Sequence, residues 1–393
     1  MFAAGRTHTR DRVAGSASAA GARAVAVAVD SAIAALGREA GLVLMFLSGD
    51  VDPDAAACEA KEAAGDAHVA GMTGTGAIDA DGLVETGCVA IAFSSALSAG
   101  VGAIEADDPR AAGRDATAEA LAGIDAPHAI VLLLVDSESG DQADYVAGAY
   151  EVAGGRIPLA GGAAGGLARA RFADGRALSS GVVAVAIGSV APIGVGVAHG
   201  CIPLGAPSIV TRSEGANVIE LDGRPAEDVY FAKLGVDGVD LDDEEFETLA
   251  MVHPLAEPEL SGTVRPRYVR ARAPGGGLVC ATSIEQNAAV AVCEQTPDAI
   301  VQSARAAVED ATSELAGPPE AALVFDCAAR SAWFRGPVAA ALAGRELDSL
   351  TAAFGHPAPS LAGVYTRGEI GRSRGAKGDR NHSVVVAAFS AAD

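Results

Sequence analysis

Reactive and charged side chains follow an apolar run near the C-terminal end of the chain. The run Leu323–Phe325 is followed by Asp326, Cys327 and Arg330. A guanidinium is a planar fork of N–H donors that suits a carboxylate, and a cysteine thiolate is a nucleophile. Buried strands that end in such groups hold them rigidly, so we predict a pocket at this strand end.

Two further apolar runs end or begin at polar residues that could also contact a ligand. One ends in a glycine turn that carries Tyr365 and Glu369, and the other begins at Asn381. A glutamate suits an ammonium group, so Arg330 and Glu369 together would suit a zwitterion such as an amino acid. The alternative, from spacing alone, is that these two residues form a structural ion pair or face solvent.

The composition excludes several classes of partner. Apolar residues make up 50% of the 393 residues and aromatic residues only 4%, so the core must consist of Ala, Val, Leu and Ile. The formal net charge is −23, and there is no long basic run, so nucleic acid and anionic membranes are not expected partners. We interpret the acidity as a solvated surface typical of an acidic, salt-adapted proteome.

The cysteines and the hydropathy pattern indicate a reducing compartment. The six cysteines are scattered, without paired spacing, so neither a zinc site nor a disulfide framework is expected. No apolar run reaches the roughly 18 residues of a membrane span, and no cleavable signal is recognisable. We expect a cytoplasmic protein with no metal and no cofactor.

A pattern of apolar runs and glycine turns recurs three times and predicts the fold class. Each copy reads strand, polar loop, helix, strand ending in Ala-Gly, glycine turn, strand. The copies begin near Leu42, Ala129 and Leu323. Short apolar strands alternating with helices predict an α/β (mixed α+β) fold with a strand-rich layered core covered by helices.

Two domains are expected from the length. Residues 1–24 lack periodicity and are assigned to a loose leader. An acidic run after residue 239 marks the boundary, so the domains are residues 25–238 and 239–393. An amphipathic helix is predicted from Asp298 to Leu315.

Other chemistry has weaker support. The glycine-rich stretch 161–166 lacks the Gly-Lys-Ser/Thr ending of a phosphate loop, which favours a tight turn. Cys327 with His356 or His382 is a possible Cys–His nucleophile pair, but nothing in the spacing brings these residues together. Asp136 and Asp326 end corresponding strands and are acid–base candidates or polar caps.

The motifs resemble those of the FIST-domain family over nearly the whole chain, from about residue 25 to 391. The stretches 324–330, 363–371 and 381–386 resemble the FIST C-terminal domain, and 68–73, 157–163 and 218–226 resemble the FIST N-terminal domain. The resemblance implies a cytoplasmic sensory module of signal transduction that binds a small ligand such as an amino acid. The pocket candidates that it implies are Cys327, Arg330, Tyr365, Gly368, Glu369 and Asn381.

We therefore expect a sensory protein that binds an amino-acid-like or small carboxylate metabolite. In this hypothesis Arg330 takes the carboxylate and Glu369 the amine, while Tyr365 and Asn381 donate orienting hydrogen bonds. The sequence ends just past the last strand, so a separate signalling protein is the expected partner. The alternatives are an enzyme that uses Cys327 as nucleophile and an interaction scaffold that binds no ligand.

Overall fold

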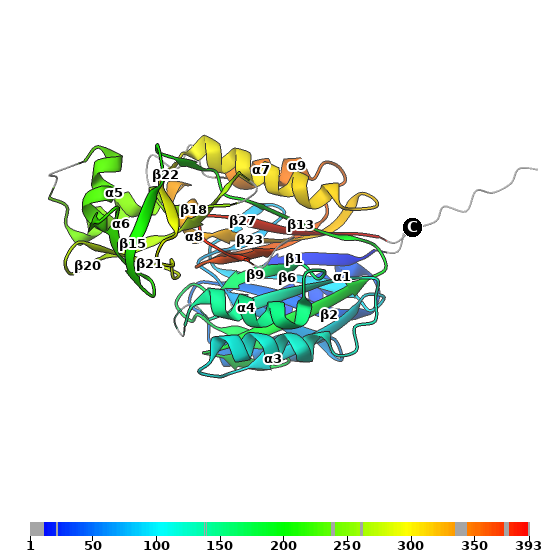
Figure 1. The fold of residues 1–393 in the computed structure, drawn as a ribbon. Coiled ribbons are helices and arrows are strands. Elements are labelled where there is room, and N and C mark those ends of the chain that lie inside the picture. The colour runs from blue at the N-terminus through cyan, green and yellow to red at the C-terminus, as the bar shows by residue number, and fades with distance from the viewer. Residues whose placement is uncertain are drawn as a thin grey trace, which may run out of the picture.

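The computed structural model describes residues 12–20, 23–136, 138, 140–236, 240–259, 262–334, 344–372 and 377–391. Within these ranges the chain forms three six-stranded sheets and one nine-stranded sheet (Figure 1). Helices cover the outer faces of the six-stranded sheets. This arrangement confirms the predicted α/β (mixed α+β) fold class.

The three six-stranded sheets are built by three units of the same element order. Unit I comprises β1 (Ala14–Ala19), α1 (Ala24–Leu36), β2 (Ala40–Ser48), α2 (Pro53–Ala64), β3 (His68–Thr73), β4 (Ala77–Asp79), β5 (Gly82–Val84) and β6 (Gly87–Ser94). Unit II comprises β7 (Ser98–Ile104), α3 (Pro109–Leu121), β8 (His128–Val135), α4 (Gln142–Ala153), β9 (Leu159–Ala163), β10 (Arg171–Ala173), β11 (Arg176–Leu178) and β12 (Val182–Ser189). Unit III begins with β13 (Ile193–Ala198) and, after an insertion, comprises α7 (Pro297–Ser313), β23 (Pro319–Cys327), α8 (Ala328–Ser331), η1 (Ala332–Phe334), α9 (Arg345–Ala353), β24 (Ser360–Thr366), β25 (Glu369–Arg372), β26 (Asp379–Arg380) and β27 (Val384–Ser390).

The units interlock because a hairpin of each unit pairs with the sheet of a neighbouring unit. The sheets share one strand order, β1-β6-β2-β3, β7-β12-β8-β9 and β13-β27-β23-β24. The hairpin β4–β5 extends the sheet of unit III, β10–β11 extends that of unit I, and β25–β26 extends that of unit II. We call the three units together the body. The predicted threefold repeat of strand, helix, strand, turn and strand is confirmed.

Side chains from all three sheets pack into one central core. This core contains Phe46 of unit I and Phe325 of unit III, whose rings lie 5.8 Å apart edge to face, together with apolar residues of β8 and β12. Phe93 and Phe389 make a second such contact at 5.2 Å. Burying one common core stabilises the three units together, since none of them could bury its inner face alone.

Glycines on the edge strand of each sheet let a helix lie close to it. A Cβ atom placed on Gly194 of β13 would lie 1.7 Å from the carbonyl oxygen of Ala311 in α7. At Gly100 of β7 the corresponding distance to Ala120 O in α3 is 2.3 Å. Gly15 of β1 is placed in the same way against α1. The helices α1, α3 and α7 therefore pack in equivalent places, with alanines facing the sheets.

The insertion spans residues 201–295 and forms the nine-stranded sheet. It comprises β14 (Cys201–Pro203), β15 (Ser208–Glu214), β16 (Asn217–Leu221), β17 (Arg224–Pro225), α5 (Ala226–Leu234), α6 (Asp243–Val252), β18 (Leu255–Pro258), β19 (Val264–Arg267), β20 (Val269–Ala273), β21 (Gly277–Cys280) and β22 (Ala289–Gln295). Figure 1 shows it at one end of the body, on the left of the view. The boundary expected between residues 238 and 239 falls inside this sheet, because β14–β17 precede it and β18–β22 follow it.

The first described residues correct one expectation. Residues 14–19, assigned to a loose leader, form β1 and pair antiparallel with β6 from Ala14–Phe93 to Ala19–Cys88. Their small side chains show no apolar period, but they allow α1 to pack directly on the strand. The predicted amphipathic helix is confirmed as α7. No helix in the described part of the chain is long and apolar enough to cross a membrane.

Candidate functional site

The three units meet at one end of their strands through a ring of backbone hydrogen bonds. Each bond joins the turn after one unit's third strand (β3, β9 or β24) to the end of the corresponding strand of another unit. The N–H of Thr75 donates to Tyr365 O at 3.1 Å, that of Gly165 to Thr73 O at 2.9 Å, and that of Arg367 to Ala163 O at 3.0 Å. The ring holds these turns in fixed relative positions.

A cavity of about 390 Å³ lies at this ring, between the body and the insertion, and we call it the strand-end cavity. Thr75, Ala163 and Arg367 belong both to the ring and to the cavity wall. The remaining charged and polar lining residues of the body are Asp136, Glu138, Gln142, Cys327 and Asn381, and those of the insertion are Glu247, Tyr268, Arg270 and Thr282. A ligand in the cavity would touch both parts.

Three buried polar atoms on residues of the cavity wall, Thr75 Oγ1, Asp136 Oδ2 and Thr282 Oγ1, have no hydrogen-bond partner among the described residues. Asp136 follows β8 and is 3% exposed; its Oδ1 accepts the N–H of Glu138 at 2.9 Å. Within the described residues nothing bonds to Asp136 Oδ2 or to Oγ1 of Thr282, which is 2% exposed. An unpaired buried polar group costs about 1–3 kcal/mol, so these atoms favour a polar ligand at this place.

Arg171 lies behind Asp136. Its side chain is inaccessible to solvent, its Nη1 donates to Arg169 O at 2.7 Å, and the same atom lies 3.9 Å from Asp136 Oδ1. Burial lowers the pKa of Arg171, and the charge of Asp136 opposes that shift. Burial likewise raises the pKa of the neighbouring Tyr145 to about 12, and Asp136 adds to it. The favourable partner for the Arg171 charge is therefore the Asp136 carboxylate.

Cys327 occupies the same place in unit III as Asp136 in unit II. Val135 pairs with Ala163 in the register in which Asp326 pairs with Tyr365, so the next residues, Asp136 and Cys327, correspond. The sequence interpretation had matched Asp136 with Asp326, one residue away. The thiol is buried. Burial raises the pKa of Cys327, and the charge of Glu369 raises it further.

Arg330 does not reach the cavity, contrary to its expected contact with a ligand carboxylate. The side chain is fully buried: Nε donates to Asp326 Oδ1 at 2.7 Å, and Nη2 pairs with Glu346 of α9. Nη1 donates to Ser303 Oγ at 2.9 Å and to His199 O at 3.0 Å. Burial raises the pKa of Glu346 to about 8, and the second carboxylate, Asp326, adds to the shift. Every nitrogen of the guanidinium is used within the protein.

Glu369 also lies beneath the cavity rather than in its wall. Thr366 Oγ1 donates to its Oε1 at 2.8 Å, and the Ser383 N–H donates to Oε2 at 3.1 Å. Burial raises the pKa of Glu369 to about 8. Arg330 pairs with Asp326 and Glu346, so the alternative of a direct Arg330–Glu369 ion pair is not found among the described residues.

The other three sequence candidates shape the cavity. Asn381 lines it, and its Oδ1 accepts the backbone N–H of Tyr268 at 3.1 Å, which links the body to the insertion. Gly368 has φ +149°, and a Cβ atom there would lie 2.4 Å from Oε1 of Gln142, a lining residue. Tyr365 contributes its carbonyl oxygen to the ring, while its side chain packs among apolar residues of unit III.

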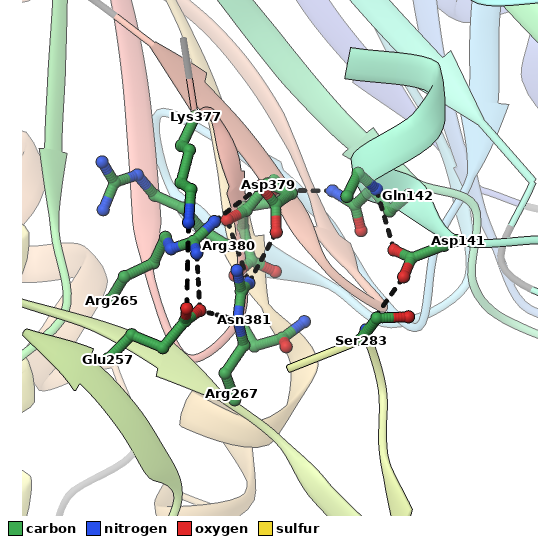
Figure 2. A network of polar contacts seen from close by, with 12 residues as sticks. Asp141, Gln142, Glu257, Arg265, Arg267, Ser283, Lys377, Asp379, Arg380 and Asn381 are labelled. Atoms are coloured by element: carbon green, nitrogen blue, oxygen red, sulfur yellow. Dashed lines mark hydrogen bonds and ion pairs between the residues drawn. The ribbon is translucent and has the colours of Figure 1, made fainter. Parts of the chain in front are cut away.

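The insertion is attached to the body next to the cavity by a buried network of ion pairs, which we call the seam (Figure 2). Arg265 and Arg267 of β19 contact Asp379 of β26 at 2.8 and 2.7 Å. Glu257 of β18 contacts the same arginines at 2.5 and 2.8 Å. Since Asn381 follows Asp379 by two residues, the seam and the cavity wall share one short segment.

The body and the insertion also meet on the other side of the cavity. Asp141 caps α4 by accepting the Ala143 N–H through Oδ1 at 2.9 Å, and its Oδ2 accepts the N–H of Ser283 at 2.8 Å (Figure 2). Gln142, the next residue, donates to Glu369 O at 2.7 Å. Contacts between the body and the insertion thus lie on two sides of the cavity.

A larger groove, of about 1070 Å³, runs between α7 and the β18–β19 hairpin. Its arginines are paired within the protein: Arg265 with Glu257, and Arg380 with Glu259 at 3.5 Å. Among the residues that the structure describes, no group of three or more His, Cys, Asp or Glu side chains could hold a metal ion. The strand-end cavity is therefore the better candidate for a ligand site.

Two family models together match most of the chain. Residues 41–224 match the FIST N domain, and residues 226–372 match the FIST C domain. The chain belongs to the FIST-domain family. FIST domains are associated with sensing in signal transduction, and the earlier resemblance is confirmed.

Relatives of this FIST-domain chain add no further role. Two uncharacterized proteins of Mycobacterium tuberculosis, from two strains, are each 29% identical over 233 residues, which is 56% of this chain and 56% of the relative. The chain thus spans about half the length of these curated relatives. A cyanuric acid hydrolase from A. caulinodans aligns at 14% identity with a TM-score of 0.24, covering 44% of this chain and 70% of that one.

Most of the cavity wall was not predicted from the sequence. Asp136 was considered only as an acid–base group or a strand cap, and Arg270, Arg367 and Thr282 were not considered at all. A signal was present for Asp136, because it follows the first strand of its repeat as Cys327 does. No sequence signal marks the insertion residues, which come from a region outside the repeat.

Proposed function

We propose that this FIST-domain protein is a sensory protein that binds a small ligand in the strand-end cavity. The observation that carries the proposal is the set of unpartnered buried atoms, Thr75 Oγ1, Asp136 Oδ2 and Thr282 Oγ1, on residues that line one cavity. Polar groups that converge in a concave site and lack internal partners are typical of ligand sites. A scaffold that binds no ligand would gain nothing from leaving them unpaired.

The proposed ligand is an amino-acid-like molecule or a small carboxylate. Two cations of the wall, Arg270 and Arg367, are exposed and replace Arg330 as carboxylate partners. Asn381 and Tyr268 supply amide and phenol groups, and Cys327 lines the wall as a buried thiol. Tyr365, Gly368 and Glu369 act indirectly in this proposal, because they support the wall from below.

The signal is proposed to pass through the insertion. A ligand that contacts Asp136 of the body and Thr282 of the insertion stabilises the arrangement in which the two are close. The seam and the Asn381–Tyr268 bond connect the same surfaces, so a change at the cavity alters the attachment of the insertion. A separate signalling protein would recognise that change, and the free cysteines suit a cytoplasmic location.

An enzyme that uses Cys327 as nucleophile has less support. Catalytic cysteines have a lowered pKa and partial exposure. Burial and Glu369 raise the pKa of Cys327, and the side chain is only 5% exposed. His382, the candidate base, bonds to Gln295 through Nδ1 at 3.0 Å. Burial lowers the pKa of His382 to about 3.

The test is a thermal-shift screen with amino acids and small carboxylates, in high salt. A compound present at 100 times its dissociation constant adds about 2.7 kcal/mol to the free energy of unfolding. We expect a shift for the wild type that is reduced in Arg270→Ala and Arg367→Ala. Arg176→Ala is the matched control, since Arg176 is an exposed arginine of unit II paired with Glu105 outside the cavity. No shift with any compound would contradict the proposal.

A further inference from the structure

We propose that the strand-end cavity selects molecules that combine an N–H or O–H donor with an anionic group, and rejects plain carboxylates. The donor would meet Asp136 and the anion would meet Arg270 and Arg367. This inference rests on the proposed function and narrows its ligand class. It follows from which hydrogen-bonding groups of the wall are left unpaired and where they lie.

The inner end of the cavity requires a donor. An ionised carboxylate only accepts hydrogen bonds, and Asp136 Oδ2 has no donor among the described residues. Arg171 Nη1 lies 3.9 Å from the other oxygen, Oδ1, and so leaves Oδ2 open to a donor. Thr282 Oγ1, from the insertion side, can donate or accept. A ligand atom that donates to Asp136 and bonds with Thr282, such as an amino or hydroxyl group, satisfies both.

The outer end presents positive charge. Arg270 lies on β20 and has no ion-pair partner in the described part of the chain. Arg367 lies 3.7 Å from Glu138, and both side chains are about half exposed, so this contact is weak and a ligand carboxylate could compete for it. An anion would gain charge-assisted hydrogen bonds from both arginines.

The two ends are close enough for one small molecule. The N–H of Arg367 donates to Ala163 O, and Ala163 pairs in register with Val135, the residue before Asp136. Neighbouring strands lie about 4.8 Å apart, and β9 lies between Asp136, which follows β8, and Arg367, so the two backbones are separated by roughly two strand spacings. The long Arg367 side chain can span part of that separation, and α-amino acids and 2-hydroxy acids place a donor next to a carboxylate. A plain carboxylate leaves Asp136 unpaired and brings a second negative charge towards it.

The test uses matched compounds that differ only at the donor. Binding of alanine, lactate and propionate, and of glutamate, 2-hydroxyglutarate and glutarate, would be measured by thermal shift and calorimetry. We expect an amino or hydroxy acid to bind at least about tenfold more tightly than its unsubstituted partner, since a hydrogen bond to a charged group is lost. Equal binding within each series would overturn the inference but leave the proposed function standing. No binding by any compound would overturn both.

Two variants locate the effect. Asp136→Asn presents an amide in place of the carboxylate, and we expect it to abolish the preference for the amino or hydroxy acid. Thr282→Val removes the unpaired Thr282 oxygen without changing the shape of the side chain, and it tests the same site if Asp136→Asn does not fold. Asp50→Asn, an exposed aspartate outside the cavity, is the control and should retain the preference. Wild-type discrimination in both cavity variants would overturn the assignment.

Discussion

Arg267 of the insertion lies with its Nη1 2.7 Å from Oδ2 of Asp379 in the body, and both side chains are nearly inaccessible to solvent. Arg265 reaches the other oxygen of the same carboxylate at 2.8 Å. A buried pair contributes little net stability compared with apolar packing, but removing one partner leaves an uncompensated charge. The seam therefore fixes the position of the insertion. A substitution of Asp379 tests this role.

The variant Asp379→Ala should loosen the insertion. It leaves two buried arginines to share Glu257, and we expect the free energy of unfolding to fall by about 3–5 kcal/mol. Hydrogen exchange should accelerate in residues 255–267 before it does so in the sheets of the body. Glu309→Ala is the control, because it breaks an exposed pair with Arg305 in α7 worth about 0–1 kcal/mol. Similar exchange in the two variants would show that the seam does not hold the insertion.

The variant Arg330→Ala should act on stability, since the side chain has no ligand role in this geometry. Asp326 and Glu346 would remain buried without their shared cation, which costs about 3–5 kcal/mol. Chemical denaturation measures the loss, and Arg345→Ala, at an exposed pair with Asp298, is the comparison. If Arg330→Ala folds with wild-type stability and loses ligand binding, the original assignment of Arg330 to a carboxylate is restored.

The sequence predicted the repeat but only part of the cavity wall, Cys327 and Asn381, and the reason is physical. Each unit's strands are short apolar runs bounded by glycine turns, so their number and order could be read from the pattern. The site depends on contacts between segments far apart in sequence, such as Thr282 with the cavity next to Asp136. Arg330 shows the same limit: its partner Glu346 lies on α9, and no spacing rule brings α9 to it. Hydrophobic periodicity describes single elements, whereas buried polar pairing depends on tertiary packing.

Close helix packing on the edge strands predicts a large effect for Gly194→Ala. The added Cβ would lie 1.7 Å from Ala311 O, which is backbone and cannot move alone, so α7 must shift. We expect a loss of about 1–3 kcal/mol, as for other overpacked cores. Gly317→Ala is the matched control, because no atom lies within 4 Å of the added Cβ. Equal melting temperatures for the two variants would mean that α7 does not sit as close to β13 as the structure shows.

Glu369 should make stability depend on pH. Its pKa is raised by burial from 4.5 to about 8, so the folded protein holds a proton that the unfolded chain releases near pH 4.5. The stabilisation from this group is complete below pH 4.5 and is lost as the pH rises to about 8. Glu369→Gln removes the titration but keeps an amide of similar shape at the position that accepts from Thr366. The free energy of unfolding of the variant, relative to that of wild type, should therefore increase as the pH rises from 5 to 8, as measured by urea denaturation. The exposed Glu119→Gln serves as control and should run parallel to wild type, and a Glu369→Gln curve that also runs parallel would mean that Glu369 is ionised throughout this range.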